Sequence, residues 1–352
     1  MTIFLKFNYR LSISLFSIIA VVSCNSDDKK TIPDVSNIIS EVKIIRFEKE
    51  LFALSQIKKA DSLTIGIRNL EAKYPSVCNE FFLNIINAKK QNEAPSAYYP
   101  LVNRFITDTF VRFTEDTAQM VFNNFEPIKK ELEQAGKFYK YYFPKANDLT
   151  FLTFVSQYNY DVFPFGKDSI GIGLDFFLGE NHADYKNIEN LRYDYVRRTL
   201  TKEHLAARAL RLQIANMAGE PTGAKMLDLM IHNGKQLYIL DQILPLTPDS
   251  IKFSYTGKQT NWCKDNESGI WASILKNNVL YESNGKKIGK LISPSPNSPG
   301  MPPEAPGETA NFIGWQIIKQ YMKRNPETTL SQLLSLREAQ QILDKSKYKP
   351  AK

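Results

Sequence analysis

Cysteine and histidine are scarce in this 352-residue chain, with three residues of each. It has no Cys-x-x-Cys pair and no two histidines one helical turn apart, so the spacings typical of structural zinc sites and of zinc-peptidase helices are missing. If Cys24 is modified, Cys78 and Cys263 remain. A disulfide between them is one alternative, but free cysteine also packs well as a small apolar residue. We expect two separate buried thiols.

Long apolar runs are missing too, apart from residues 11–22. As a helix this run extends about 18 Å, which is short of the ~30 Å hydrocarbon core of a bilayer. Two basic residues precede it, and Val21-Val22-Ser23-Cys24 follows. This sequence resembles a lipobox, in which a small residue fits the signal peptidase and the thiol receives the lipid. We predict a signal peptide over residues 1–23 and acylation of Cys24; the alternative is an ordinary cleaved signal with an incidental cysteine.

The segment that follows the cysteine is polar and charged. We expect residues 24–34 to form a lipidated flexible tether. Residues 26–28, Ser-Asp-Asp, resemble an acidic signal for export to the cell surface, although a generic solvated linker explains them equally well. No later stretch is long enough for a transmembrane helix. The lipid is therefore the expected anchor, and it places the chain in the cell envelope outside the cytoplasm, on the periplasmic face or the cell surface.

Basic residues are in modest excess over acidic residues. The chain has 45 basic and 37 acidic residues, a formal charge of +8. Removal of residues 1–23 takes away Lys6 and Arg10, which leaves 43 basic and 37 acidic residues and a net charge near +6. No stripe of Arg and Lys interleaved with aromatic residues is present, so we do not expect the chain to bind nucleic acid.

Hydrophobic periodicity predicts many helices and few strands. We therefore expect one mainly α-helical α+β domain over residues 35–352, with a small β-rich element. Six prolines between residues 293 and 307 predict an extended, helix-free loop. The predicted strands cover residues 41–47, 149–158 and 169–179, and the predicted helices cover 48–56, 60–73, 76–89, 97–113, 116–142 with a bend near Pro127, 186–218, 223–243, 257–278 and 308–323.

Two details concern the C-terminal helices. The helix over residues 308–323 presents two alternative apolar stripes, Phe312–Trp315–Ile318 or Ile313–Ile317–Tyr321. The last helix is expected to open with a capping box at residues 335–338, Ser-Leu-Arg-Glu, because a serine followed three residues later by glutamate can satisfy two free backbone N–H groups.

One segment is compatible with a degenerate zincin-like scaffold. Residues 204–208, His-Leu-Ala-Ala-Arg, stand where a zincin carries His-Glu-x-x-His. Leucine cannot activate water and arginine cannot bind zinc, and Asn233 stands about where a third carboxylate ligand is expected. Chance similarity is the simpler explanation. We predict no catalytic residue, no metal ligand and no cofactor; the alternative is a metal-dependent, peptidase-like hydrolase of the envelope that uses His182, His204 or His232.

Several motifs in a fixed order resemble the GldB family of gliding-motility lipoproteins. The resemblance implies a lipid-anchored, non-enzymatic assembly or scaffold component of the gliding machinery, linked to type IX secretion, with other gliding or secretion proteins as partners. One departure is His232-Asn233, where an acidic residue is expected before Gly234-Lys235. The motifs are residues 32–36 (IPDVS), 42–48 (VKIIRFE), 171–179 (GIGLDFFLG), 262–267 (WCKDNE), 270–271 (IW), 306–309 (PGET), 313–318 (IGWQII) and 348–350 (YKP).

Overall fold

The structure is a computed structural model that describes residues 32–351. The predicted signal peptide, Cys24 and nearly all of the predicted tether lie outside the described residues. Residues 35–351 form one compact unit. This unit is mainly helical with a small mixed sheet, which confirms the predicted fold class. No helix among residues 32–351 combines the length and the apolar character that a membrane span requires.

The sheet has four strands in the order β1-β2-β4-β3. The predicted strands are confirmed as β1, β2 and β4, which pair in parallel, whereas the antiparallel edge strand β3 was not predicted. Gly171 and Gly173 lie in β4. A Cβ at either position would press against the Phe154 ring, so the two glycines allow close packing of the strand. The strands are β1 (Lys43–Arg46), β2 (Thr150–Phe154), β3 (Val162–Pro164) and β4 (Ser169–Gly173).

The N-terminal helices break more often than their periodicity predicts. Asp108 ends one helix and caps the next, because its carboxylate accepts hydrogen bonds from the backbone N–H groups of Phe110 and Val111. The long helix with a bend at Pro127 is wrong: Pro127 lies in the first turn of a new helix, where its missing N–H costs nothing. The helices are α1 (Phe47–Ala53), α2 (Ala60–Lys73), α3 (Pro75–Glu80) followed by a π-helical turn (Phe81–Ile85), α4 (Pro95–Thr107), α5 (Thr109–Val121) and α6 (Glu126–Tyr142).

The predicted helix over residues 186–218 is also wrong in its first half. Only α7 (Asp194–Arg197), a 3-10 turn (Lys202–His204) and α8 (Leu205–Ala218) form there. Tyr185 explains part of this, because its buried hydroxyl donates to the Asp175 carbonyl and accepts from the Leu178 N–H, which ties the segment to the end of the sheet.

The C-terminal half is a set of helices below α8. The predicted helix over residues 223–243 is confirmed as α9, and that over residues 257–278 is interrupted at Asn266. The capping box predicted at residues 335–338 is wrong. Thr329 and Gln332 form a capping box at the start of α15, and Glu338 precedes α16 without a side-chain hydrogen bond to its N-terminus. The helices are α9 (Met226–Ile243), α10 (Asp249–Phe253), α11 (Gly257–Asp265), α12 (Glu267–Lys276), α13 (Gly285–Ile292), α14 (Thr309–Arg324), α15 (Leu330–Ser335) and α16 (Ala339–Ser346).

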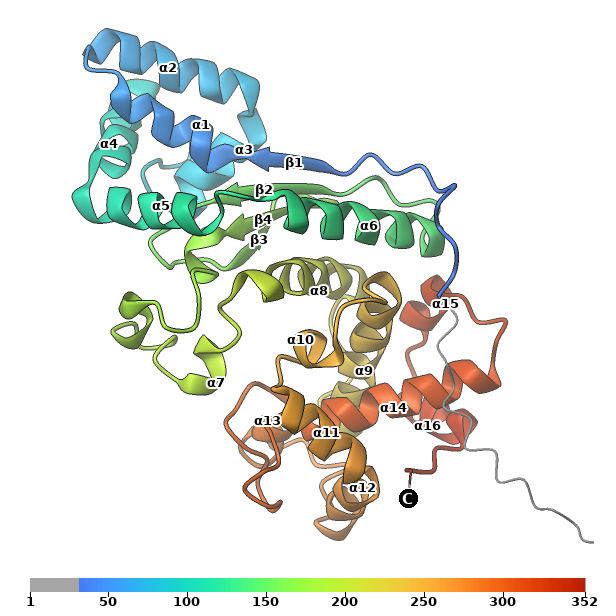
Figure 1. Cartoon of the computed structure of the whole chain (residues 1–352). Coiled ribbons are helices and arrows are strands. Elements are labelled where there is room, and N and C mark those ends of the chain that lie inside the picture. The colour runs from blue at the N-terminus through green and yellow to red at the C-terminus, as the bar shows by residue number, and fades with distance from the viewer. Residues whose placement is uncertain (1–31, 352) are drawn as a thin grey trace, which may run out of the picture. The chain divides into compact units, whose positions relative to one another are not determined.

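The layers follow from these contacts. Helix α8 packs on β3 and β4, α9 packs on α8, and α14 packs on α9 (Figure 1). Both predicted stripes of α14 are buried, because α9, α12, α13 and α16 surround it. Cys78 and Cys263 are buried, free thiols, as expected. The proline-rich segment between α13 and α14 is helix-free, as predicted, and its two ends line the cavity described next.

Candidate functional site

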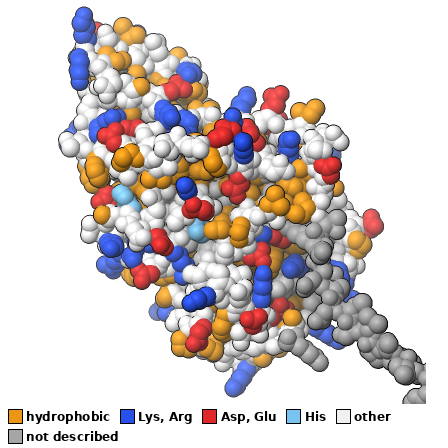
Figure 2. Space-filling view, viewed as in Figure 1, with side chains coloured by type: hydrophobic (Ala, Val, Ile, Leu, Met, Phe, Trp, Pro, Cys, Tyr) orange, Lys and Arg blue, Asp and Glu red, His pale blue; other side chains and the backbone are white. Residues whose placement is uncertain are grey.

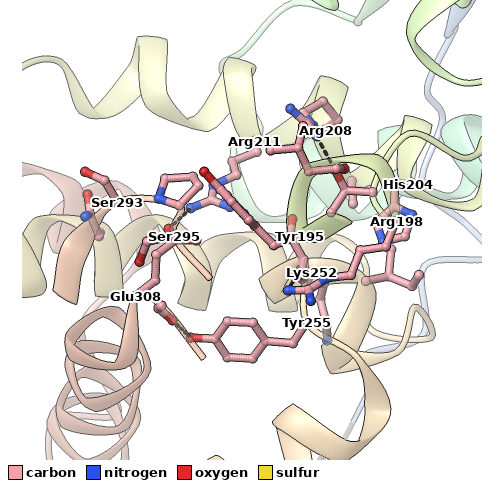
Figure 3. Close-up of a pocket in the computed structure, with 18 of the residues that line it drawn as sticks. Tyr195, Arg198, His204, Arg208, Arg211, Lys252, Tyr255, Ser293, Ser295 and Glu308 are labelled. Carbon is pink, nitrogen blue, oxygen red and sulfur yellow. Dashed lines mark hydrogen bonds and ion pairs between the residues drawn. The ribbon is translucent and has the colours of Figure 1, made fainter. Parts of the chain in front are cut away.

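A cavity of about 590 Å³ lies among α8, α9, the chain around α10 and the two ends of the proline-rich loop. Its volume is in the range of small-molecule sites. In Figure 3 the side chains of Arg198, His204 and Lys252 enter it from one side, and those of Ser295 and Glu308 from the opposite side. Basic and acidic side chains are otherwise interspersed on the face shown in Figure 2, without a large block of one sign.

One wall comes from the start of α8 and the 3-10 turn before it, through Arg208 and His204. Arg208 Nη1 lies 2.7 Å from Asp161 Oδ2, and Nη2 donates to Thr199 Oγ1 at 2.9 Å. His204 Nδ1 lies 3.0 Å from Thr201 Oγ1. Burial, and then the charge of Arg208, lower the pKa of His204 to about 4, so the imidazole is neutral at pH 7. This wall therefore presents a neutral histidine beside a neutralised arginine.

Lys252 of α10 is also neutralised. It is only 4% exposed, and its ammonium forms ion pairs with Asp241 and with Asp249, the latter at 3.1 Å. Asp249 accepts a second hydrogen bond from Lys264. Burial alone would raise the pKa of Asp249, but these two lysines lower it below its usual value. The carboxylates thus hold the lysine charge in place from outside the cavity.

Arg198 differs from the other basic residues because the described residues give it no ion pair. Its Nη2 donates to the backbone carbonyl of Ser254 at 3.3 Å, and its buried Nε has no hydrogen-bond partner among residues 32–351. Burial lowers the pKa of this guanidinium, against the more distant influence of Tyr255 and Glu308. The cavity therefore contains a partly desolvated arginine whose donors are not all used.

The opposite wall comes from the ends of the proline-rich loop. Gly307 allows the close approach, since a Cβ there would lie 2.9 Å from the Ser295 amide nitrogen, and Tyr255 donates to the Gly307 carbonyl at 2.8 Å. Glu308 follows in the left-handed region at φ 60° and is only 8% exposed. This conformation is uncommon for a non-glycine residue, and here it leads the chain into α14.

The Glu308 carboxylate is held by two side chains. Asn311 donates to Oε1 at 3.1 Å, and Arg211 of α8 lies 3.7 Å from the same oxygen. Burial raises the pKa of Glu308, whereas Arg211 and Asn311 oppose the rise. Asn233 of α9 donates to Asn311 Oδ1 at 2.9 Å, so its own carbonyl oxygen remains available at the cavity wall.

The structure brings together three positions that the zincin comparison singled out. His204, Arg208 and Asn233 line the same cavity. His182 instead contacts the Tyr158 hydroxyl at 2.8 Å, and His232 does not line the cavity. No group of three or more His, Cys, Asp or Glu residues that could hold a metal ion occurs in the part of the chain that the structure describes.

Sequence reasoning missed the residues that distinguish this cavity. Arg198, Tyr255 and Glu308 lie in turns between helices. The sequence placed Arg198 within a predicted helix, and Glu308 in the PGET motif and at the start of another predicted helix, but it gave neither side chain a role. The one usable signal was the glycine that ends the proline-rich run, Gly307, because a glycine beside a charged residue in a loop often marks a close approach.

Comparison with known proteins gave one match. Residues 28–350 match the family described as gliding motility protein GldB. No curated protein and no solved structure matched the chain. Since the match covers almost the whole chain, including every residue of the cavity, this protein belongs to the GldB family and is a gliding-motility protein.

Proposed function

We propose that this chain is a lipid-anchored component of the cell envelope, outside the cytoplasm, that supports assembly of the gliding machinery and its associated type IX secretion. The family match over residues 28–350 carries this proposal. The lipobox that ends at Cys24 supports the lipid anchor. Other gliding or secretion proteins are the expected partners, and the membrane is contacted through the attached lipid.

We also propose that the chain acts by binding rather than by catalysis. The residue beside His204 is Leu205, which is fully buried and has no proton to exchange. One turn after His204 stands Arg208, whose guanidinium is engaged by Asp161 and Thr199. These side chains offer neither a general base nor a second metal ligand, so they speak against the alternative of a metal-dependent hydrolase.

Cys24→Ala tests the anchor in cells that lack the native chain. We expect wild type, but not Cys24→Ala, to incorporate labelled fatty acid, because only the thiol can form the thioether. The variant should accumulate as unprocessed or soluble protein, and the cells should lose surface gliding. The readouts are fatty-acid labelling, membrane fractionation and colony spreading.

Cys78→Ala is the matched control. Its thiol is buried in the domain, so this variant should be labelled and fractionate like wild type. Labelling of Cys24→Ala at the wild-type level would overturn the lipid assignment. Normal gliding by cells in which Cys24→Ala is entirely soluble would overturn the need for an anchor.

A further inference from the structure

The four basic residues of the cavity divide into two classes. Asp161 neutralises Arg208, and Asp241 and Asp249 neutralise Lys252. Arg211 faces only Glu308, at 3.7 Å, and Arg198 forms no ion pair with any described residue. The carboxylates that stabilise the first pair lie outside the cavity lining. Arg211 shares its charge with Glu308, which also lines the cavity, so Arg198 carries the positive charge that no carboxylate of the described residues balances.

A guanidinium in this position is unfavourable unless something binds it. Burying an N–H donor without an acceptor loses its hydrogen bonds to water, and the loss is larger for a charged group. Arg198 Nε is buried without an acceptor, its Nη2 has only a 3.3 Å bond to the Ser254 carbonyl, and none of its nitrogens is bonded to a carboxylate among residues 32–351. Oxyanions match the planar fork of arginine and form its strongest hydrogen bonds. An oxyanion in the cavity would supply a charged acceptor for the Nη groups of this guanidinium.

The opposite wall indicates the rest of the ligand. Ser293, Asn233 and Glu308 line the cavity, and their side chains carry a hydroxyl, an amide and a carboxylate. These groups can donate to or accept from hydroxyls. Arg211 already faces the Glu308 carboxylate, so a cationic ligand is not needed there. The volume, about 590 Å³, exceeds what a single inorganic anion occupies and accommodates a sugar-sized body.

We propose that this cavity binds a small polyhydroxylated molecule with one oxyanion group, that is, an acidic or phosphorylated sugar. Arg198 and Arg211 bind the oxyanion, and Asn233, Ser293 and Glu308 bind the hydroxyls. This proposal goes beyond the role in gliding and does not rest on it, because it concerns a ligand of the isolated protein.

Calorimetric titration of the full chain, purified in detergent, tests the proposal with three matched probes. Glucose 6-phosphate and glucuronate present a phosphate or a carboxylate on the same sugar, and neutral glucose presents neither. We expect one or both charged sugars to bind, which also identifies the oxyanion, and we expect glucose not to bind. Affinity should fall when salt is raised to about 0.5 M, since the attraction is partly electrostatic.

Arg198→Met should weaken binding at least about tenfold, because it removes charge-assisted hydrogen bonds. Arg211→Met should also weaken binding, and it provides a second test if the first variant does not fold, as judged by its melting temperature. Arg192→Met is the matched control, since Arg192 is exposed and outside the cavity; its affinity should stay within about twofold.

Three results would overturn the proposal. They are no binding of either charged sugar by folded wild type, equal binding of glucose, and unchanged affinity in folded Arg198→Met and Arg211→Met. None of these results would contradict the proposed role in gliding, which the Cys24→Ala variant tests separately in cells.

Discussion

Helices α9 and α14 take part in two regions that differ in packing: a close backbone contact and, within one or two turns of it, a polar cavity. At Gly234 and Gly314 their backbones touch: a Cβ on Gly234 would lie 2.8 Å from the Trp315 amide nitrogen. Next to this crossing, Asn233 and Glu308 line a polar cavity instead. The same helix pair is therefore in backbone contact at one pair of glycines, and neighbouring polar side chains of the two helices line a cavity.

The comparison shows how the stability of one region supports the other. The crossing is buried and close-packed, and it fixes the separation and angle of the two helices. The cavity contains a partly desolvated arginine and a glutamate in the left-handed region, both of which are unfavourable for folding, and a histidine whose protonation is unfavourable there. Variants at the crossing should therefore cost stability, whereas variants in the cavity should cost much less.

The largest effect is expected at the crossing. Gly314→Ala should lower the free energy of unfolding by about 3 kcal/mol or more, because the new methyl would overlap the Met230 carbonyl and neither backbone can move cheaply. Gly269→Ala in α12 is the matched control, since nothing lies within 4 Å of its Cβ position. It should be neutral or stabilise by up to about 1 kcal/mol, and urea unfolding measures both. Equal midpoints for the two variants would show that the crossing is not tight.

A smaller effect concerns the pH dependence of stability. The pKa of His204 falls from 6.5 to about 4 on folding, so between these values the unfolded state binds a proton that the folded state does not. Stability from this residue is complete above pH 6.5 and is lost as the pH falls toward 4. His204→Asn keeps a polar contact to Thr201 and should flatten the curve by up to ~1.4 kcal/mol per pH unit in this window. Above pH 7 the two curves should run parallel; identical slopes below pH 6 would contradict the assignment.

The smallest effect should come from the arginine that lacks partners. Arg198→Met should leave the free energy of unfolding unchanged or raise it slightly, because it removes a partly buried charge without an ion pair. Arg208→Met should lower it by about 1–2 kcal/mol, since Asp161 and Thr199 lose their bonds and the site is partly exposed. Chemical denaturation separates the two. A larger loss for Arg198→Met would mean that this residue is structural and would weaken the contrast between the regions.

Sequence patterns predicted the elements that depend on neighbours along the chain. The helix over residues 60–73 is found with both predicted ends, and the proline run is helix-free because six prolines remove donors and fix φ. Periodicity failed where a side chain interrupts it. Asp108 caps a new helix inside an apolar repeat, and Tyr185 holds a segment away from helical geometry through contacts with Asp175 and Leu178.

The sequence by itself determined the family and the mainly helical class, because both depend on which residues occur and in what order. It also determined that residues 204–208 lack a general base and a second metal ligand. The cavity was decided only by the tertiary structure. Its charge is set by distant pairs, Asp161 with Arg208 and Asp241 with Lys252, and by the absence of such a pair for Arg198 among the described residues. Electrostatic energy depends on distance and burial, which spacing along a chain does not fix. The same residue type therefore has a balanced charge at Arg208 and an unbalanced charge at Arg198.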